Sequence, residues 1–468
     1  MTERLSAREF LALVADQDTF HELPCPERKS EPDGPLGWQG YDASRARAAE
    51  RTDEQESVVC GTASVAGTPA VLIAFEFGFL GGSLGERTGD RLESAYVHAR
   101  EHRLPVVPLV ATGGSRMQEG MFALTQLQRV ARQSALTRKA GLPQIAVVRD
   151  PTTGGGWATL GAGADVILAL PGAQVGFAGS RVRPPDADPA AYTAEAQVAA
   201  GSADAVVPPA ELRATLGTWL RLLTSPAAKA PVPAALGTGD LPATGWAAVQ
   251  RARSPERPRA RAYLDAYFTV RTAISGDRCG GTDPDGMLCG FGEHEGRTVA
   301  YAAQTGTATR PAGYRTAARL IRLADRLGIP VLTLVDTPGA ANDAEAERQG
   351  VGAAIAEVFA AVAAARTPVT TLVVGEGGSG GALALAAPGN TYATPDSYFS
   401  VIAPEMAAAI LKRPPTRVEA TADELRIRPQ DLVELGVIRG VVGPVPSSSP
   451  GSPPPPMSPP LISPPPPG

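Results

Sequence analysis

The sequence predicts an α/β protein whose chain repeats one unit of strands and helices. Two kinds of segment occur twice in the same order. An apolar, β-branched run that ends in a glycine turn lies at 103–115 and again at 327–340. A second apolar run, which leads into a glycine-rich turn, lies at 145–158 and again at 371–384. Runs of this kind are typical of buried strands in a largely parallel sheet.

The two copies keep a nearly constant spacing along the chain. Thr112 in the first copy matches Thr337 in the second, and the difference between these two residue numbers defines the repeat offset. Pro105 and Pro330 have the same offset. In the second pair of runs we place Gly155 opposite Gly381, at an offset that is larger by one. Agreement of both order and spacing favours an internal duplication over a generic α/β chain.

Each copy also has helix-patterned segments in matching places. One precedes the first strand and another separates the two strands, so strands and helices alternate. A third element follows the second strand in each copy. The helix before the first strand lies at 89–102 and 313–327, the helix between the strands at 118–135 and 350–366, and the third element at 172–182 and 393–405.

The remaining segments set the predicted domain boundaries. Residues 1–58 are expected to form an N-terminal helix and an irregular arm, and the first repeat occupies 59–224. Residues 225–255 begin with an Ala-, Pro- and Gly-rich stretch and are expected to be a linker to the second repeat at 256–446. The Pro-rich end, 447–468, lacks the apolar surface needed to fold and is expected to be a disordered tail.

Composition argues against several classes of protein. The 468-residue chain has 43 basic and 48 acidic residues, so its net charge of −5 disfavours nucleic-acid binding through a basic stripe. The sequence has no signal-peptide pattern and no run of 18 apolar residues, so we expect a cytoplasmic protein without a membrane span. The cysteines form no C-x-x-C pair, so neither a disulfide framework nor a zinc site is expected. They are Cys25, Cys60, Cys279 and Cys289.

Four glycine-rich turns, each between a predicted strand and a predicted helix, carry the chemistry. Glycine lets a ligand approach main-chain N–H groups without a Cβ in the way. At a helix N-terminus these groups have no intrahelical acceptor and lie at the positive end of the helix dipole. Two adjoining turns can form an oxyanion hole, so two pairs of turns suit a reaction in which two carbonyl oxygens become negative. The turns are 111–120, 150–159, 336–343 and 375–384.

Other interpretations of these residues are weaker. None of the turns has the P-loop pattern, and the loose dinucleotide pattern at 375–384 lacks the acidic residue that would follow it. Ser379 has no evident histidine partner, which disfavours a Ser-His-Asp hydrolase. His98 and His102 have the spacing of a metal pair but not the rest of a metal motif, so a solvent-facing helix surface is favoured.

Arginines beside the turns are candidates for binding an anionic substrate such as coenzyme A or a carboxylate. Arg87, Arg116, Arg181 and Arg310 lie close to glycine-rich or turn segments, and Arg116 directly follows the Gly-Gly-Ser turn. A surface salt bridge is the alternative role for each of them. Glu119 is expected to be a helix-dipole partner rather than a functional carboxylate.

At these motifs the sequence resembles a known enzyme family. It resembles the β subunit of the carboxyltransferase component of bacterial acetyl-CoA carboxylase at GGSLGERTGDRL, ATGGSRMQEGMFAL and RDPTTGGGWATLGAGADVILALPGAQVGFAGSRV. It resembles the α subunit at PAGYRTAARLIRLADRLGIPVLTLVDTPGA, GEGGSGGALALA and TADELRIRPQDLVELGVIRGVV. The resemblance covers about residues 40–225 and 260–445, so the chain looks like a β half fused to an α half.

The resemblance implies two tandem ClpP/crotonase-type domains, each a β-β-α superhelix. It implies transfer of a carboxyl group from carboxybiotin to the α-carbon of acetyl-CoA or another acyl-CoA, giving malonyl-CoA-type products. The β-like half, 59–224, would bind the acyl-CoA, and the α-like half, 256–446, the biotin. Biotin would be carried in trans on a biotin carboxyl carrier protein and carboxylated by a biotin carboxylase. The chain would form a homo-oligomer, either a dimer or a hexamer.

The oxyanion holes of the family map onto the glycine turns of this sequence. One hole would hold the thioester oxygen and the other the biotin ureido oxygen. Because backbone donors hold both oxygens, no side-chain base is required. The first hole is expected near Gly114, Ser115, Gly154 and Gly155, and the second near Gly339, Gly381 and Ala382. Substrate-binding residues are expected at Gly82, Arg87, Arg116, Phe177, Arg181 and Gly380.

Two departures from the family pattern are visible. The zinc-ribbon cysteines of the β subunit are absent, so no metal is expected, and Ala341 stands where the family has an aromatic residue. Two alternative functions are considered. One is an acyl-CoA decarboxylase or other crotonase-type enzyme that needs only the first hole, and the other is an inactive scaffold subunit of a carboxylase complex.

Overall fold

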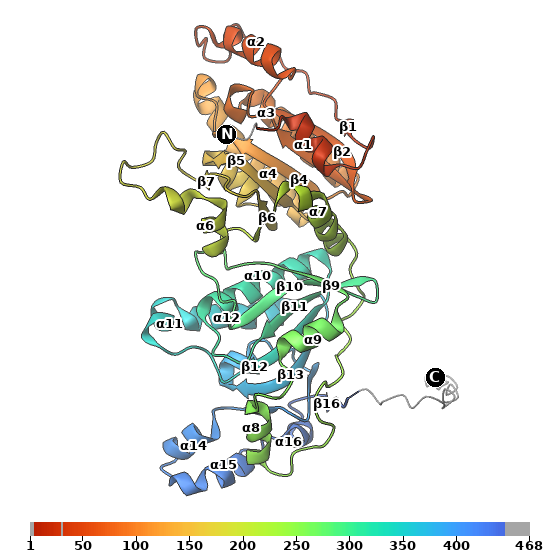
Figure 1. Cartoon of the computed structure of the whole chain (residues 1–468), viewed down its shortest axis with the longest axis vertical. Coiled ribbons are helices and arrows are strands. Elements are labelled where there is room, and N and C mark those ends of the chain that lie inside the picture. The colour runs from red at the N-terminus through yellow and green to blue at the C-terminus, as the bar shows by residue number, and fades with distance from the viewer. Residues whose placement is uncertain (1–3, 30, 445–468) are drawn as a thin grey trace, which may run out of the picture.

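A computed structural model describes residues 4–29 and 31–444 of the chain. Two α/β units follow one another along the long axis, and each contains one eight-stranded sheet (Figure 1). The tail predicted at 447–468 lies outside the described residues. Across the two described ranges, each helix is too short or too polar to span a lipid bilayer.

The first sheet has the order β1-β2-β3-β4-β5-β6-β8, with β7 paired to β5. β2 (Val58–Val65) and β3 (Thr68–Phe75) form an antiparallel hairpin. β3, β4 (Val106–Thr112) and β5 (Ile145–Thr153) are parallel, and the apolar runs of β4 and β5 predicted their parallel pairing. The shorter strands are β1 (His21–Glu22), β6 (Val166–Ala169), β7 (Val175–Gly176) and β8 (Ala205–Val206).

Helices cover both faces of the first sheet. α3 and α4 pack with one face and α1 and α7 with the other, so each face closes its own apolar core. The helices of this unit are α1 (Ala7–Val14), α2 (Tyr41–Thr52), α3 (Glu86–Glu101), α4 (Gly120–Lys139), α5 (Gly154–Gly156), α6 (Ala194–Ala199) and α7 (Pro209–Thr224).

The second sheet has the order β16-β14-β13-β12-β11-β10-β9, with β15 paired to β13. β10 (Met287–His294) and β11 (Arg297–Gln304) form an antiparallel hairpin, and β11, β12 (Val331–Thr337) and β13 (Val369–Gly378) are parallel. The remaining strands are β9 (Val270–Ala273), β14 (Thr391–Ala393), β15 (Tyr398–Ser400) and β16 (Gly440–Val441). The helices are α8 (Gly245–Arg253), α9 (Ala260–Tyr267), α10 (Pro311–Leu327), α11 (Ala344–Arg348), α12 (Val351–Ala364), α13 (Ser379–Leu383), α14 (Pro404–Ile410), α15 (Val418–Glu424) and α16 (Pro429–Glu434).

The predicted duplication is confirmed by the strand register. The ladder between β4 and β5 shifts just before Thr112, which pairs with Thr152. The ladder between β12 and β13 shifts at the matching place, just before Thr337, which pairs with Gly377. Thr112 and Thr337 are separated by the repeat offset, and so are Thr152 and Gly377. The same irregularity therefore occurs at the same place in both sheets.

The predicted pairing of Gly155 with Gly381 is wrong by one residue. The ladders with β7 and β15 align Gly154 with Ser379, and both have left-handed backbones, with φ of 62° and 58°. Gly155 therefore corresponds to Gly380. Because the first turn has three consecutive glycines, the sequence alone does not decide which of them aligns with Gly381. The backbone conformation decides it.

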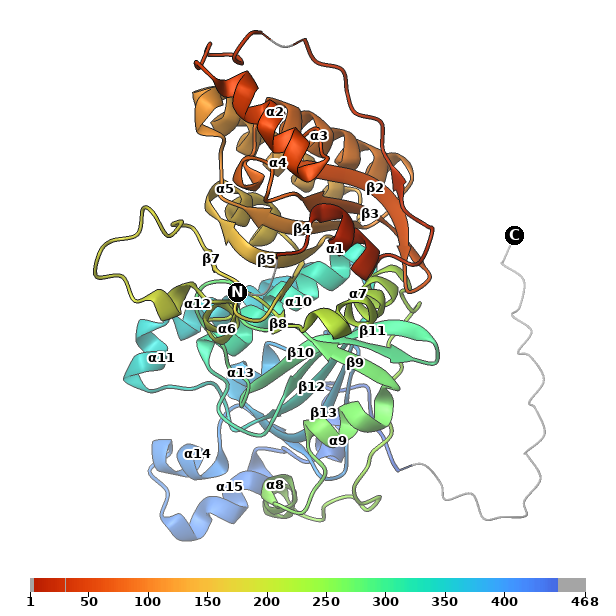
Figure 2. The ribbon, with the colours of Figure 1, turned by 45° about the horizontal axis from the view of Figure 1, so that its top comes forward.

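The two units share an interior. α7 of the first unit and α10 of the second lie between the two sheets, and one apolar core contains side chains of both units (Figure 2). Trp219 on α7 packs edge-on against Phe291 on β10, with ring centroids 6.2 Å apart. The buried Asp204 of the first unit accepts hydrogen bonds from Arg278 and Arg319 of the second, at 2.5 and 3.0 Å.

Two flanking segments differ from the sequence expectation. Part of the arm expected to be irregular forms α2, whose Ala, Arg and Glu residues favour a helix. The expected linker at 225–255 contains α8 and lies against the second unit. Thr370 donates to the carbonyl of Ala230, and the N–H of Thr238 donates to Asp396, both at 2.8 Å. The exact domain boundaries remain a prediction.

Candidate active site

The first glycine cluster consists of the loop after β4 and the turn that opens α5. Leu84 fixes the loop, because its N–H donates to the carbonyl of Gly114 and its carbonyl accepts from the N–H of Arg116, both at 2.9 Å. The N–H of Gly114 donates to Thr112 Oγ1 at 3.0 Å. A Cβ on Gly114, whose φ is 107°, would lie 3.8 Å from the Cα of Gly154, so the loop and the α5 turn are in contact.

The second glycine cluster repeats this geometry at the ends of β12 and β13. Thr309 takes the place of Leu84: its N–H donates to the carbonyl of Gly339 at 3.3 Å, and its carbonyl accepts from Ala341 at 2.9 Å. The N–H of Gly339 donates to Thr337 Oγ1 at 3.1 Å. Each of these contacts matches one in the first cluster at the repeat offset.

These contacts decide which loop amides face the helix turns. The N–H groups of Gly114 and Gly339 are engaged by threonine hydroxyls, which leaves the amides of Ser115 and Ala340 at the centre of each loop. A Cβ on Gly381 would lie only 2.6 Å from the nitrogen of Ala340, so this amide faces the start of α13. Sequence reasoning proposed Ser115 but missed Ala340, although the repeat offset links the two.

The helix turns supply the other donors. Gly155 and Gly156 lie in the first turn of α5, and Gly380 and Gly381 in the first turn of α13, where N–H groups have no acceptor within the helix. Ala382, the fourth residue of α13, is fully buried. Each cluster thus joins a loop amide to first-turn amides, an arrangement that can stabilise a negative oxygen.

Arg116 does not have the substrate-binding role expected from the sequence. Its side chain is only 1% exposed and lies behind the first loop. The guanidinium bonds both carboxylate oxygens of Glu56 and donates to the carbonyl of Ser83 at 2.8 Å and to the hydroxyl of Tyr41 at 3.1 Å. Arg116 therefore holds the loop to the strands and arm behind it, and a coenzyme A phosphate cannot reach it.

Neighbouring carboxylates keep the guanidinium of Arg116 positively charged. Burial alone would lower the pKa of this guanidinium, but the carboxylates of Glu56 and Glu119 raise it above its ordinary value. Glu119 also accepts the N–H of Glu86, the first residue of α3, at 2.6 Å. It is a helix-dipole partner as expected, although it serves α3 rather than the helix that follows it.

Comparison with known proteins decides the family. A family model described as "Carboxyl transferase domain" matches residues 41–201, and one described as "Acetyl co-enzyme A carboxylase carboxyltransferase-like" matches 242–449. The chain is 38% identical to the acetyl-coenzyme A carboxylase carboxyl transferase subunits beta/alpha of Salinispora arenicola, over 94% of this chain and 82% of that protein. It belongs to the acetyl-CoA carboxylase carboxyltransferase family. A second relative is the probable biotin-dependent acyl-coenzyme A carboxylase beta3 subunit of Mycobacterium bovis, 32% identical over 87% of this chain and 84% of that protein.

Solved structures show the same fold. The chain superposes on transcarboxylase 12S with a TM-score of 0.76 at 22% identity, covering 94% of this chain and 87% of that one. It superposes on a single-chain, multi-domain long-chain acyl-CoA carboxylase with a TM-score of 0.72 at 21% identity, covering 94% and 45%. The predicted tandem crotonase-type fold is therefore confirmed, and the predicted carboxyl transfer activity is confirmed by the family to which the chain belongs. The decarboxylase and scaffold alternatives are not favoured.

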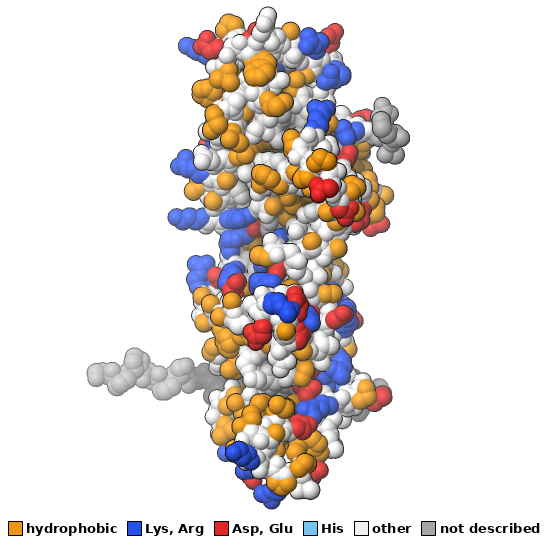
Figure 3. Space-filling view, turned by 90° about the vertical axis from the view of Figure 1, so that its left-hand side faces the viewer, with side chains coloured by type: hydrophobic (Ala, Val, Ile, Leu, Met, Phe, Trp, Pro, Cys, Tyr) orange, Lys and Arg blue, Asp and Glu red, His pale blue; other side chains and the backbone are white. Residues whose placement is uncertain are grey.

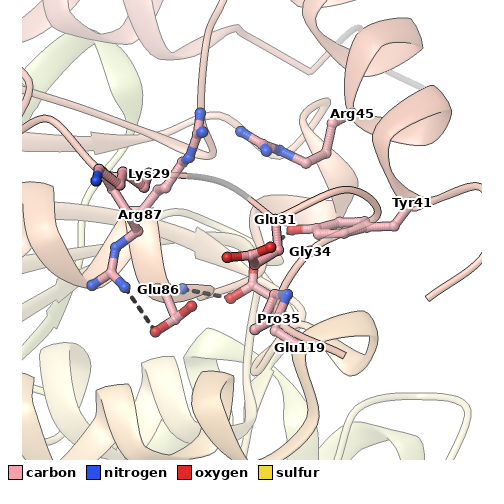
Figure 4. Close-up of a pocket in the computed structure, with 10 residues that line it drawn as sticks. Lys29, Glu31, Gly34, Pro35, Tyr41, Arg45, Glu86, Arg87 and Glu119 are labelled. Carbon is pink, nitrogen blue, oxygen red and sulfur yellow. Dashed lines mark hydrogen bonds and ion pairs between the residues drawn. The ribbon is translucent and has the colours of Figure 1, made fainter. Parts of the chain in front are cut away.

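The other predicted substrate residues of this carboxyltransferase lie in different surroundings. Gly82 is buried, and its N–H donates to the carbonyl of Phe79 at 3.0 Å. Arg87 is half-buried and lines a small pocket of about 70 Å³ between the arm and the start of α3 (Figure 4). Phe177 and Arg181 are exposed on the segment that follows β7.

Gly380 lines an apolar pocket of about 390 Å³ beside the second cluster. Its floor and walls come from α13, β15 and the last helices of the chain. The pocket thus adjoins the first turn of α13, where the free amides of the second cluster lie. The lining residues are Ser379, Gly380, Leu383, Phe399, Ser400, Val401, Leu425, Arg426, Leu432, Leu435 and Val437.

The histidine pair does not form a metal site with other residues. His98 and His102 stack on each other at the end of α3, with ring centroids 3.9 Å apart. Among residues 4–29 and 31–444, no group of three or more His, Cys, Asp or Glu side chains could hold a metal ion.

Exposed apolar side chains lie on the segments that follow both clusters. Phe177 follows β7 and is 74% exposed, and Val401 follows β15 at the equivalent position and is 71% exposed. On the side of the molecule shown in Figure 3, hydrophobic side chains gather over the first unit and again at the far end of the second. Those on the segments that follow the first cluster are Met117, Met121, Phe122, Phe177 and Val182, and those on the segments that follow the second are Leu383, Val401, Met406, Ile410 and Leu411.

Proposed function

We propose that this carboxyltransferase moves a carboxyl group from carboxybiotin on a biotin carboxyl carrier protein to the α-carbon of an acyl-CoA. The first cluster would hold the thioester oxygen, and the second the ureido oxygen of biotin. With acetyl-CoA the product is malonyl-CoA, a precursor for fatty acid or polyketide synthesis. The observation that carries the proposal is that one backbone arrangement, a loop amide beside a helix N-terminus, occurs twice at the repeat offset.

The proposed transfer needs two negative oxygens and one proton transfer. The bond between the carboxyl carbon and the biotin nitrogen breaks, and a bond from that carbon to the thioester α-carbon forms. The proton of the α-carbon passes to the ureido group of biotin. The contribution of this chain is to hold the two oxygens with amides that are already oriented, which favours the charged transition states.

The geometry supports a proposed assignment of residues. Ser115, Gly155 and Gly156 would supply the amides for the thioester, and Ala340, Gly380, Gly381 and Ala382 those for biotin. Gly114, Gly154 and Gly339 shape the turns, because their left-handed φ angles are ones that side chains rarely adopt. Under this proposal, 59–224 is the acyl-CoA domain and 256–446 the biotin domain.

A second copy of the chain is the proposed partner for the exposed apolar surfaces. Part of each surface adjoins a cluster, since the carbonyl of Phe177 accepts the N–H of Gly154 and both Leu383 and Val401 line the pocket with Gly380. Apolar patches of this kind mark interaction sites. In a homodimer, the first cluster of one protomer would face the second cluster of the other, so that acyl-CoA and biotin meet between them. Transcarboxylase 12S is described as a hexamer, so a hexamer built from such pairs is the larger alternative. A biotin carboxylase would recharge the carrier.

The test is an assay of the full chain with a carboxylated carrier protein and a panel of acyl-CoAs. Mass spectrometry should detect an acyl-CoA that has gained one CO₂, together with loss of CO₂ from the carrier. The panel should run from acetyl-CoA to long-chain thioesters, which also identifies the preferred acyl group. Failure to carboxylate any thioester, with a carrier shown to be carboxylated, would refute the proposal.

A further inference from the structure

Two buried side chains converge on one carbonyl at the start of α13. The hydroxyl of Tyr314 and the side-chain N–H of Gln304 both donate to the carbonyl oxygen of Gly381, each at 3.1 Å. Both side chains are fully buried. In a longer helix this carbonyl would accept from Leu385, but the N–H of Leu385 donates to Ala382 instead, at 3.2 Å. The two side chains therefore replace the missing helix bond.

This contact fixes the orientation of the turn. A peptide unit is planar, so donors that hold the carbonyl of Gly381 also fix the N–H of the same unit, which belongs to Ala382 and points the opposite way. They thereby hold the first turn of α13, where the amides of Gly380 and Gly381 also lie. The hydroxyl of Tyr314 would lie 2.6 Å from a Cβ on Gly381, as would the nitrogen of Ala340. Tyr314 thus lies at the contact between the second loop and the first turn of α13. Hydrogen bonds to the carbonyl of Gly381 also polarise that amide, which strengthens the N–H of Ala382 as a donor.

Burying the polar side chain of Gln304 destabilises the fold, so packing alone does not explain why a glutamine occupies this position. Its side-chain oxygen is buried, and no hydrogen-bond partner for it lies in the described part of the chain. An unpaired buried acceptor is destabilising, and a hydrocarbon side chain would avoid the penalty. Buried polar groups of this kind are expected where their other contacts serve a function.

The first cluster lacks this pair of donors. The strand register aligns Gln304, the last residue of β11, with Phe75, the last residue of β3. The repeat offset aligns Tyr314 with Gly89. Neither Phe75 nor Gly89 has a side chain that can donate a hydrogen bond. The pair of donors Gln304 and Tyr314, which we call the polar clamp, is therefore found at the second cluster and not at the first, although the two clusters are otherwise similar.

We propose that Gln304 and Tyr314 are positioning residues that set the amides of the second cluster for the carboxyl-donor half of the reaction. This inference rests on the proposed function, in which the second cluster holds the ureido oxygen of biotin. It assigns the polar clamp to the step that must stabilise charge on the carboxyl donor, and it leaves acyl-CoA binding to the first cluster unaffected.

The test compares Tyr314→Phe and Gln304→Met with the control Tyr96→Phe. Tyr96 is also a buried tyrosine, but it lies on α3 in the first unit. The reverse reaction, transfer from malonyl-CoA to biocytin, a soluble analogue of carrier-bound biotin that here accepts the carboxyl group, gives kcat and both KM values. We expect kcat/KM for biocytin to fall about tenfold in each clamp variant, the size of one lost hydrogen bond. Affinity for acyl-CoA, measured by calorimetry, should stay within about twofold of wild type, as in Tyr96→Phe.

Hydrogen exchange provides a readout that does not depend on activity. The amides of 379–383 should exchange faster in Tyr314→Phe and Gln304→Met than in wild type or Tyr96→Phe. Unchanged exchange in this segment, or an equal loss of acyl-CoA affinity, would overturn the inference. Absence of transfer in the wild-type chain would instead refute the proposed function, and the exchange data would still decide whether the two side chains hold the turn. If Tyr314→Phe fails to fold, Gln304→Met decides the question alone.

Discussion

Replacing Gly381 with alanine is the most direct test of the second cluster. The added Cβ would lie 2.6 Å from the nitrogen of Ala340 and 2.6 Å from the hydroxyl of Tyr314. Ordinary contact begins at 3.4 Å, so the loop or the helix turn must move by about 0.8 Å. Such a movement separates the two sets of amides that are proposed to hold one oxygen.

The expected loss is large because catalysis depends on sub-ångström placement. A misplacement of about 1 Å can lower the rate about 10²-fold, and removal of one oxyanion-hole donor lowers kcat about 10²- to 10³-fold. We therefore expect Gly381→Ala to lower kcat about 10²-fold, which corresponds to about 2.7 kcal/mol of transition-state stabilisation. The assay is transfer between malonyl-CoA and biocytin, with acyl-CoA affinity measured separately by calorimetry.

The control for this variant is Gly352→Ala on the exposed surface of α12. A Cβ at this position meets no atom within 4 Å, and alanine favours the helix by about 1 kcal/mol over glycine. This variant should keep wild-type activity and should not melt at a lower temperature. The reasoning is refuted if Gly381→Ala retains more than about a third of the wild-type kcat, or if its lost activity follows lost acyl-CoA affinity.

Three further outcomes follow from buried charges and thiols. Asp204→Ala should destabilise the chain by about 3–5 kcal/mol in urea unfolding, because it leaves the arginines of the second unit buried without their carboxylate. Glu56→Gln should lower the melting temperature, because it leaves the charge of Arg116 buried without the Glu56 carboxylate, while calorimetry should show unchanged acyl-CoA affinity. A selective loss of acyl-CoA affinity would instead indicate that Arg116 contacts the substrate. Burial raises the pKa of Cys60 and Cys289 to about 12, so both stay protonated at pH 8, and a thiol reagent should label only the two exposed cysteines until the chain unfolds. Rapid labelling of four thiols in native protein would contradict the burial of these two.

Local patterns predicted the fold and the location of the clusters. The β-branched runs and the glycine turns follow from residue type alone, so both sheets and both clusters could be placed before any coordinates. The one-residue error at Gly155 arose because consecutive glycines carry no information about backbone φ. The helix at 41–52 was missed because its composition lacks an apolar stripe, although its individual residues favour a helix.

Contacts between distant residues could not be predicted from one sequence. Arg116 looks like a substrate contact because it follows the glycine turn, and its burial depends on Glu56, 60 residues earlier in the chain. The same holds for Gln304 and Tyr314, whose target carbonyl is separated from them by 77 and 67 residues. Tertiary packing decides these roles, and only the folded arrangement brings the partners together.

The interior shared by the two sheets has a consequence for how the chain melts. Trp219 and Phe291 belong to different units yet pack in one core, so neither unit can lose its structure without exposing the apolar side of the other. Severing the covalent connection after α7 would leave two fragments that must find each other as subunits do, with a stability that depends on concentration. Kept in one polypeptide, the halves are held at fixed proportion and should denature together, in a single calorimetric peak.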